Sequence, residues 1–146
     1  MAGINAMFDS MNVSLSALQA QRRRMDVVAG NLANAESTRS PQGGPYQRQQ
    51  VVFETVLNDA IASPDGQSAG QGVAAVSVVP DRRPPIPVHM PGHPDADANG
   101  NVLMPDVRPA EEMADLISAA RSYEANAVAM KISRGVMQRA IELGRG

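Results

Sequence analysis

The chain has 146 residues, 43% of them apolar, but only two Phe, two Tyr and no Trp, which excludes a core of bulky aromatic side chains and favours a helical core of Leu, Met, Val and Ala. The net charge of −2 provides no global field for nucleic acid or an acidic membrane surface, so no nucleic-acid partner is predicted. The absence of cysteine excludes disulfides and thiolate metal sites.

Residues 1–36 predict one long helix. Apolar residues recur there in alternating steps of four and three, the spacing of a coiled-coil seam, and only Arg22 interrupts the pattern. A dense run of Ser, Thr, Pro and Gly from Ser37 to Pro45 then predicts that the helix ends near Asn34 to Thr38. We expect the following seam residues to pack within the chain: Ile4, Phe8, Met11, Leu15, Leu18, Met25 and Leu32.

Residues 37–108 predict loops and a small, loop-rich β insertion. Val51–Val56 could be a strand or a short buried helical turn, because six residues cannot distinguish the two, whereas Val73–Val79 indicates a strand. Eight prolines between Pro80 and Pro109 forbid long helices and leave extended backbone. The turn signal Asn99-Gly100 predicts a hairpin whose second strand is Val102–Met104.

Residues 109–146 predict a second long helix. Pro109 suits the first helical position, and the charges of Glu111 and Glu112 suit the positive end of the helix dipole. The helix should end at Gly144. Its apolar residues again recur in three-four steps, and they extend the intrachain seam with Met113, Leu116, Tyr123, Met130, Met137 and Ile141.

We expect the two helices to pair as an antiparallel coiled coil, which makes the fold mainly α with one helical domain built from both ends of the chain. In the register that aligns Asn34 with Ala110, Arg22 lies near Tyr123 and Glu124, and Arg134 lies near Asp9. Such a pair cannot bury all of the remaining apolar positions, so we expect contacts with further copies of the chain. The subunit-interface candidates are Val13, Val27, Val28, Asn31, Asn34, Ile117, Val128 and Ile132.

Motifs that could carry chemistry lack the structural context that they need. Gly66–Gly70 matches G-x-S-x-G but has no large α/β sheet around it. His89 and His93 have the spacing of two helical metal ligands, yet Pro91 and Pro94 make a helix there implausible. We therefore predict that the protein is not an enzyme and has no cofactor and no small-molecule substrate.

The segment from Asp95 to Asp106 comes close to a calcium-binding loop. It has Asp where a bidentate Glu is expected, and Pro94 and Pro105 remove both flanking helices. The simpler interpretation is a hairpin turn, in which Asp, Asn and Gly supply the turn geometry. Calcium binding is kept as a minor alternative to the prediction of no metal, with the candidate ligands Asp95, Asp97, Asn99 and Asp106.

No segment is predicted to cross a bilayer, because the chain has no run of about 18 apolar residues. Residues 1–16 also lack the charged start, the apolar core and the cleavage site of a secretory signal. If the protein leaves the cytoplasm, we expect it to use a route without a cleaved signal peptide.

Residues 16–38, SALQAQRRRMDVVAGNLANAEST, resemble the N-terminal signature of the bacterial flagellar rod and hook family. In that family a seam of this kind ends in an N-x-A-N motif, formed here by Asn31, Ala33 and Asn34. The segment from Thr38 to Arg48, followed by VVFE, is similar to the proximal-rod branch of the family. The resemblance thus reaches from the first helix into the loop that follows it.

Two later segments continue the resemblance. Pro94–Val107, with a hairpin that ends M-P-D-V, and Glu111–Asn126, EEMADLISAARSYEAN, are similar to the same proximal-rod branch. The resemblance covers nearly the whole chain and is weakest from Asp59 to Val79.

The resemblance implies a structural subunit of the proximal rod of the flagellar basal body, the axle that transmits motor torque through the periplasm and surrounds the export channel. It implies export by the flagellar type III apparatus, followed by helical assembly through the terminal helices. The implied partners are further copies, other proximal and distal rod subunits and the rod-to-ring adaptor at the base. The loop expected to contact them contains Thr38, Arg39, Pro41, Gly43, Gly44, Pro45 and Tyr46.

An alternative of a different class is a helical adaptor that oligomerises through the same seams. Such an adaptor would be folded and oligomeric in pure solution, whereas a rod subunit would be largely monomeric with mobile ends.

Overall fold

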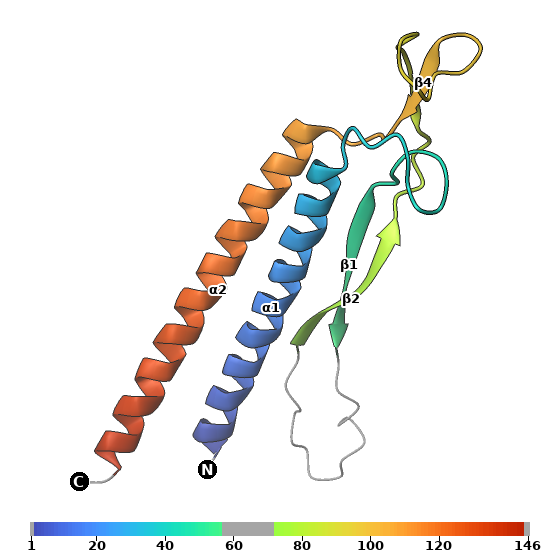
Figure 1. The fold of residues 1–146 in the computed structure, drawn as a ribbon. Helices are drawn as coiled ribbons and strands as arrows, with labels where there is room; N and C mark the ends of the chain where they lie inside the picture. Colours follow the sequence, from blue (N-terminus) through green and yellow to red (C-terminus); the bar gives the residue numbers. More distant parts are fainter. Residues whose placement is uncertain (1, 57–71, 145–146) are drawn as a thin grey trace.

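The computed structural model describes residues 2–56 and 72–144, and within them the side chains of residues 10–54 and 77–144. Two long helices and two small antiparallel pairs of strands make up these residues (Figure 1). The side chains of Ile4 and Phe8 and the Gly66–Gly70 motif lie outside this description. The elements are α1 (Ala2–Ala33), β1 (Gln49–Val56), β2 (Gly72–Pro80), β3 (Ile86–His89), β4 (Asn101–Met104) and α2 (Pro109–Leu143).

The two helices pack side by side and antiparallel: the start of α1 and the end of α2 lie at the same end of the molecule (Figure 1). The second helix begins at Pro109 with Glu111 and Glu112 in its first turn, as predicted, and the N–H of Gly144 closes it by bonding to the carbonyl of Ala140 at 3.1 Å. The first helix ends at Ala33, immediately before the predicted window. The predicted fold class, mainly α with a small β part, is therefore confirmed.

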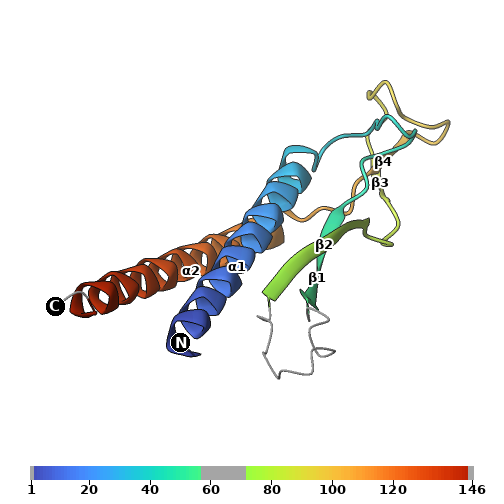
Figure 2. The same ribbon diagram turned by 90° about the horizontal axis from the view of Figure 1, so that it is seen from below.

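β1 and β2 form an antiparallel ribbon that runs from the pair Gln49↔Pro80 to the pair Val56↔Gly72. The ambiguous segment Val51–Val56 is thus a strand, because a long-range partner is available for it, and the strand predicted at 73–79 is confirmed. In both ribbon views α1 lies between α2 and this ribbon (Figures 1 and 2). The ribbon therefore covers one side of α1 and makes no extensive contact with α2.

β3 and β4 form the predicted hairpin, with Ile86 opposite Met104. Gly100 in its turn has φ +75°, a left-handed conformation that glycine adopts without steric cost. The hairpin stands beyond the end of the helix pair at which α1 ends and α2 begins (Figure 1). Val102, the residue of the hairpin with the least exposed surface, is 1% exposed.

The packed faces of the helices differ from the predicted seam. The buried positions are Ala20, Val28 and Asn31 on α1, and Glu112 and Ala119 on α2. On α2 the buried positions begin at Glu112 instead of the predicted Met113, which is 54% exposed. Three further seam candidates are also exposed: Leu15, Tyr123 and Ile141. The predicted inward orientation of these four residues is wrong.

Two causes explain why the buried faces of the helices differ from the predicted seam. Apolar residues occur on all sides of α2, so periodicity alone does not select the buried face. The small residues Ala20 and Ala119 are buried, and the hydrogen bond between Asn31 and Glu112 fixes the buried side of both helices. Val28 and Asn31, predicted to contact other subunits, are consequently buried within the chain, and that assignment is corrected. The coiled-coil geometry itself stays a prediction.

Within the described residues, no helix combines the length and the apolar character needed to cross a bilayer.

Candidate functional site

Asn31 is the centre of the junction at which α1, α2 and the ribbon meet. Its Nδ2 donates to the carbonyl of Gln49 at 2.9 Å and to Oε2 of Glu112 at 3.0 Å. Its Oδ1 accepts from the N–H of Gln49 at 2.9 Å and from the hydroxyl of Tyr46 at 3.0 Å. Both donors and both acceptor positions of the amide are used. At the start of β1, Asn31 thereby bonds the backbone N–H and C=O of Gln49, as a neighbouring strand would.

Glu112 is a buried carboxylate in the first turn of α2, with 1% of its side chain exposed. A charge at this depth is costly unless it is paired and hydrogen-bonded. Arg48 supplies the cation, with its Nε 2.6 Å from Oε1 of Glu112, and Asn31 donates to the other oxygen. Sequence reasoning assigned Glu112 only to the helix dipole, so its role as the anchor of the junction was missed.

The ion pairing continues from Arg48 toward the hairpin. Arg48 Nη1 lies 3.2 Å from Oδ2 of Asp81, which follows β2, and Arg83 bridges Asp81 at 2.8 Å and Asp106 at 3.2 Å. We call Glu112, Arg48, Asp81, Arg83 and Asp106, five charges that alternate in sign, the junction network. It connects α2, the loop before β1, the exit of β2 and the segment between β4 and α2.

Two members of the junction network, Asp81 and Arg83, have shifted pKa values. Burial acts to raise the pKa of Asp81, but hydrogen bonds from Arg83 and Arg48 outweigh it and hold that pKa below its ordinary 3.8. The hydrogen bond to Asp81 raises the pKa of Arg83. Burial, and then the charge of Glu112, raise the pKa of Tyr46. The network therefore favours the charged forms of both Asp81 and Arg83 at neutral pH.

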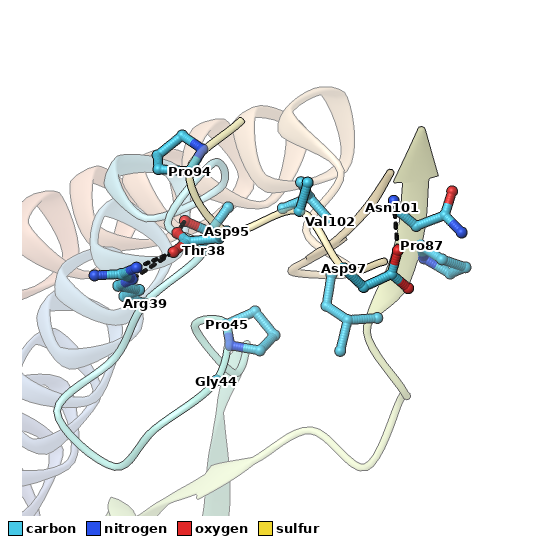
Figure 3. A pocket seen from close by; sticks show the side chains of 12 residues that line it. Thr38, Arg39, Gly44, Pro45, Pro87, Pro94, Asp95, Asp97, Asn101 and Val102 are labelled. Carbon is cyan, nitrogen blue, oxygen red and sulfur yellow. Dashed lines mark hydrogen bonds and ion pairs between the residues drawn. The ribbon is translucent and has the colours of Figure 1, made fainter. Parts of the chain in front are cut away.

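The predicted contact loop is attached to the β3–β4 hairpin through Asp95. The hydroxyl of Thr38 donates to Oδ2 of Asp95 at 2.8 Å, and Arg39 pairs with Oδ1 (Figure 3). The Thr38 hydrogen bond is the main cause that lowers the pKa of Asp95. Together with Pro45 and Val102 these residues line an open groove of about 590 Å³ between the loop and the hairpin. Part of the predicted loop is thus engaged within the chain.

The candidate calcium ligands have other partners. Asp95 binds Thr38 and Arg39, Asp106 pairs with Arg83, and Oδ1 of Asp97 accepts from the N–H groups of Asn99 and Asn101, each at 2.8 Å. Contacts of the Asp97 kind are typical of a turn. Across residues 2–56 and 72–144, no group of three or more His, Cys, Asp or Glu side chains could hold a metal ion. The geometry therefore favours the hairpin-turn interpretation.

The side of α2 opposite Glu112 and Ala119 carries a second feature, a band of exposed apolar residues. Three of them are the interface candidates Ile117, Val128 and Ile132, which are 53%, 57% and 62% exposed. Met113 and Val136 are exposed beside them. Large apolar residues that gather on one exposed face of a helix can mark an interaction surface. We call these five residues the outer face of α2, and it is a candidate assembly surface.

The remaining predicted residues differ in their burial and in their contacts. On α1, Val13 is exposed, whereas Val27 and Asn34 are half-buried. Arg24, not Arg22, reaches α2, where its Nη2 lies 3.0 Å from Oδ1 of Asp115. The contact between Asn31 and Glu112 lies within one turn of the register that aligns Asn34 with Ala110. Half-buried seam residues are Met11, Leu18, Met25, Leu32, Leu116, Met130 and Met137.

Family comparison gives two matches. Residues 11–39 match the model of the flagella basal body rod protein, and residues 98–143 match the model described as flagellar basal body rod FlgEFG protein C-terminal. These segments contain most of α1, the β4 strand and α2.

Curated relatives match nearly the whole chain. A flagellar basal-body rod protein FlgC of Bacillus subtilis is 42% identical over 94% of this chain and 98% of the relative. FlgC proteins of Salmonella typhimurium and Borreliella burgdorferi are 40% and 38% identical, each over 96% of this chain and 99% of the relative.

Proposed function

The chain belongs to the FlgC family of flagellar basal-body rod proteins, and we propose that it assembles into the proximal rod through the outward faces of its two long helices. Family membership makes the protein a structural subunit of the flagellar basal body with a role in motility. The observation that carries the proposed mode of assembly is the outer face of α2. Its Ile117, Val128 and Ile132 are each more than half exposed in the single chain.

Burial of that face provides the driving force for assembly. A large apolar side chain contributes about 1.5–3 kcal/mol when it moves from water into a packed interface. Charged residues cannot replace it there without an unpaired charge becoming buried. Copies that pack side by side would cover the outer face and share the applied torque over many contacts.

The junction network gives the subunit a defined shape in this proposal. It connects the helix pair to both β elements through ion pairs of 2.6–3.2 Å. A network of paired charges favours one geometry over others, because an alternative arrangement separates a charge from its partner. The β elements would therefore keep a constant position relative to the tube of helices.

The finer aspects of function follow from the family and are part of the same proposal. The rod would transmit torque across the periplasm and surround the export channel, and the subunit would arrive by type III export without a cleaved signal. The exposed part of the contact loop, including Pro41, Gly43 and Gly44, would touch other proximal and distal rod subunits or the rod-to-ring adaptor. The protein would act without catalysis.

A deletion strain tests the proposal. Electron microscopy of its basal bodies should show rings without a complete rod, and the wild-type gene should restore both the rod and swimming. Rods of normal length in the deletion strain would contradict the proposal. The helical-adaptor alternative predicts instead that the pure protein sediments as a stable oligomer.

A further inference from the structure

The solvent side of α1 carries its own regular row of residues. Leu15, Gln19, Arg22, Asp26, Ala29 and Ala33 follow one another in steps of four and three, and all are exposed. They therefore lie along one stripe of the helix, on the side away from the buried Ala20 and Val28. We call these six residues the outer stripe of α1. Its centre is charged, and its ends are apolar or small.

Charged residues also lie at the centre of the outer face of α2, where they interrupt its apolar residues. Between Ile117 and Val128 the exposed positions on this side include Arg121 and Glu124. No ion pair joins Arg22, Asp26, Arg121 or Glu124 to any other side chain among the residues whose side chains are described. At the centre of each surface there is thus one cation and one anion, and none of these four charges has an ion-pair partner among the described side chains.

The spacing of these charges selects one way of combining the two surfaces. When the helices run antiparallel, an alignment that places Arg22 opposite Glu124 also places Asp26 opposite Arg121. The same alignment brings Leu15 to Ile132. Charge complementarity and apolar contact therefore coincide in one register. With the helices parallel, an alignment that places Arg22 opposite Glu124 places Asp26 opposite Val128, so only one of the two ion pairs can form.

We propose that the outer face of α2 is covered by the outer stripe of α1 from a second copy of this chain, with Arg22–Glu124 and Asp26–Arg121 as the ion pairs that set the register. The inference rests on the proposed assembly through the helices and names the partner of that surface. Because α1 and α2 are antiparallel within one chain, an antiparallel contact between copies leaves all copies pointing in the same direction. The two surfaces differ, so the contact is head-to-tail and can continue from copy to copy.

Cysteine cross-linking tests the partner and the register together, because the native chain has no cysteine. Basal bodies from a strain that carries Leu15→Cys and Ile132→Cys in one chain should yield, on oxidation, bands at twice the mass of the subunit that disappear on reduction. The control combines Leu15→Cys with Ile117→Cys. It uses the same surfaces, but Ile117 lies about 22 Å from position 132 along the helix, so no such band should form.

Two cross-linking results would overturn the inference. A band that contains the subunit joined to a protein of another mass, with none at twice the mass, would assign the surface to a different rod protein. Equal amounts of dimer from both cysteine pairs would show that the register is wrong.

Charge reversal tests the ion pairs. Arg22→Glu or Glu124→Arg alone should lower the amount of subunit in purified basal bodies by about fivefold, the effect expected for one exposed ion pair turned into a repulsive contact. The double variant Arg22→Glu/Glu124→Arg restores the attraction and should recover most of the incorporation. Both single variants should keep the wild-type circular dichroism and melting temperature, because neither side chain forms an ion pair with any side chain that the structure describes.

The outcomes separate this inference from the proposed function. A deletion strain without rods, combined with full incorporation of both single charge variants, would refute the ion pairs and leave the rod assignment standing. A double variant that is as defective as the single variants would also refute them. Normal rods in the deletion strain would refute the rod assignment itself.

Discussion

Asn31 and Glu112, 81 residues apart in sequence, share a hydrogen bond of 3.0 Å between Nδ2 and Oε2, and each of the two residues is only 1% exposed. The bond holds the end of α1 against the start of α2. Because Asn31 also bonds both backbone groups of Gln49, one side chain determines where the ribbon begins relative to the helix pair.

Replacement of Asn31 by alanine should therefore be strongly destabilising. Asn31→Ala removes the hydrogen bonds to Oε2 of the buried Glu112 and to both backbone groups of Gln49, and we expect the free energy of unfolding to fall by about 3 kcal/mol. Urea unfolding of the purified protein, followed by circular dichroism, measures the change. Asn34→Ala is the matched control. Asn34 is half-buried, and its side chain makes two local hydrogen bonds: Nδ2 donates to the carbonyl of Gly30, and Oδ1 accepts from the hydroxyl of Ser37. Its loss should therefore cost about 1 kcal/mol. Equal losses would contradict the central role of Asn31.

Arg48 should stabilise the fold because it neutralises the buried carboxylate of Glu112. Arg48→Met leaves the buried Glu112 without its cation, and we expect a loss of about 3–5 kcal/mol in the free energy of unfolding. The double variant Arg48→Met/Glu112→Gln removes both charges and should be more stable than Arg48→Met alone. If the second change lowers stability further, the cost does not come from an unpaired carboxylate.

The stability of the protein should fall in acid, in part because of Asp81. Its folded pKa is held below the ordinary 3.8 by Arg83 and Arg48, so its contribution is present above that value and is lost as the pH falls through the lower folded pKa. Asp81→Asn should lower the free energy of unfolding at pH 7 and approach the wild type near pH 3. Denaturant titrations over this range measure the difference. Asp26→Asn, at an exposed position without an ion pair, should run parallel to the wild type. A constant gap between Asp81→Asn and the wild type would refute the linkage.

The hairpin turn should not tolerate a side chain at Gly100. Gly100 has φ +75°, and a Cβ built there would lie 3.1 Å from both His89 Cε1 and Pro91 Cβ. We expect Gly100→Ala to destabilise the hairpin by about 1–2 kcal/mol. Amide exchange of β3 and β4 reports the local opening. At Gly92 an added Cβ meets nothing within 4 Å, so Gly92→Ala should leave that exchange unchanged. Slow exchange in both variants would show that the turn is less restricted than its geometry implies.

Aspartate should have different effects on the two sides of α2. Leu116 is half-buried against the helix pair, so Leu116→Asp should lower the free energy of unfolding by about 2–4 kcal/mol and abolish swimming. Ile132 is 62% exposed, so Ile132→Asp should leave unfolding within about 0.5 kcal/mol of the wild type and still abolish swimming. Swimming halos and urea curves on the same variants make the comparison. A freely swimming Ile132→Asp strain would argue that the outer face is not an assembly surface.

Local signals predicted the elements themselves. The three-four periodicity, Pro109 with two glutamates after it, and Gly144 determined the two helices and the limits of α2, while Asn99-Gly100 determined the hairpin turn. These predictions succeeded because each depends on the backbone conformation of neighbouring residues. The motifs from Ser16 to Asn126 also identified the family, because a family motif is a property of the sequence itself.

The tertiary structure decided which faces are buried and where the polar groups meet. Apolar residues occur on all sides of α2, so its periodicity fits several rotations about the helix axis equally well. The contacts of Asn31 with Glu112 and of Arg24 with Asp115 select one of them. The partners of Arg48 lie 33 and 64 residues away in the sequence. No local pattern relates such positions. A buried ion pair forms only when the whole chain brings opposite charges together out of water, and for this reason the junction network became visible only in the folded molecule.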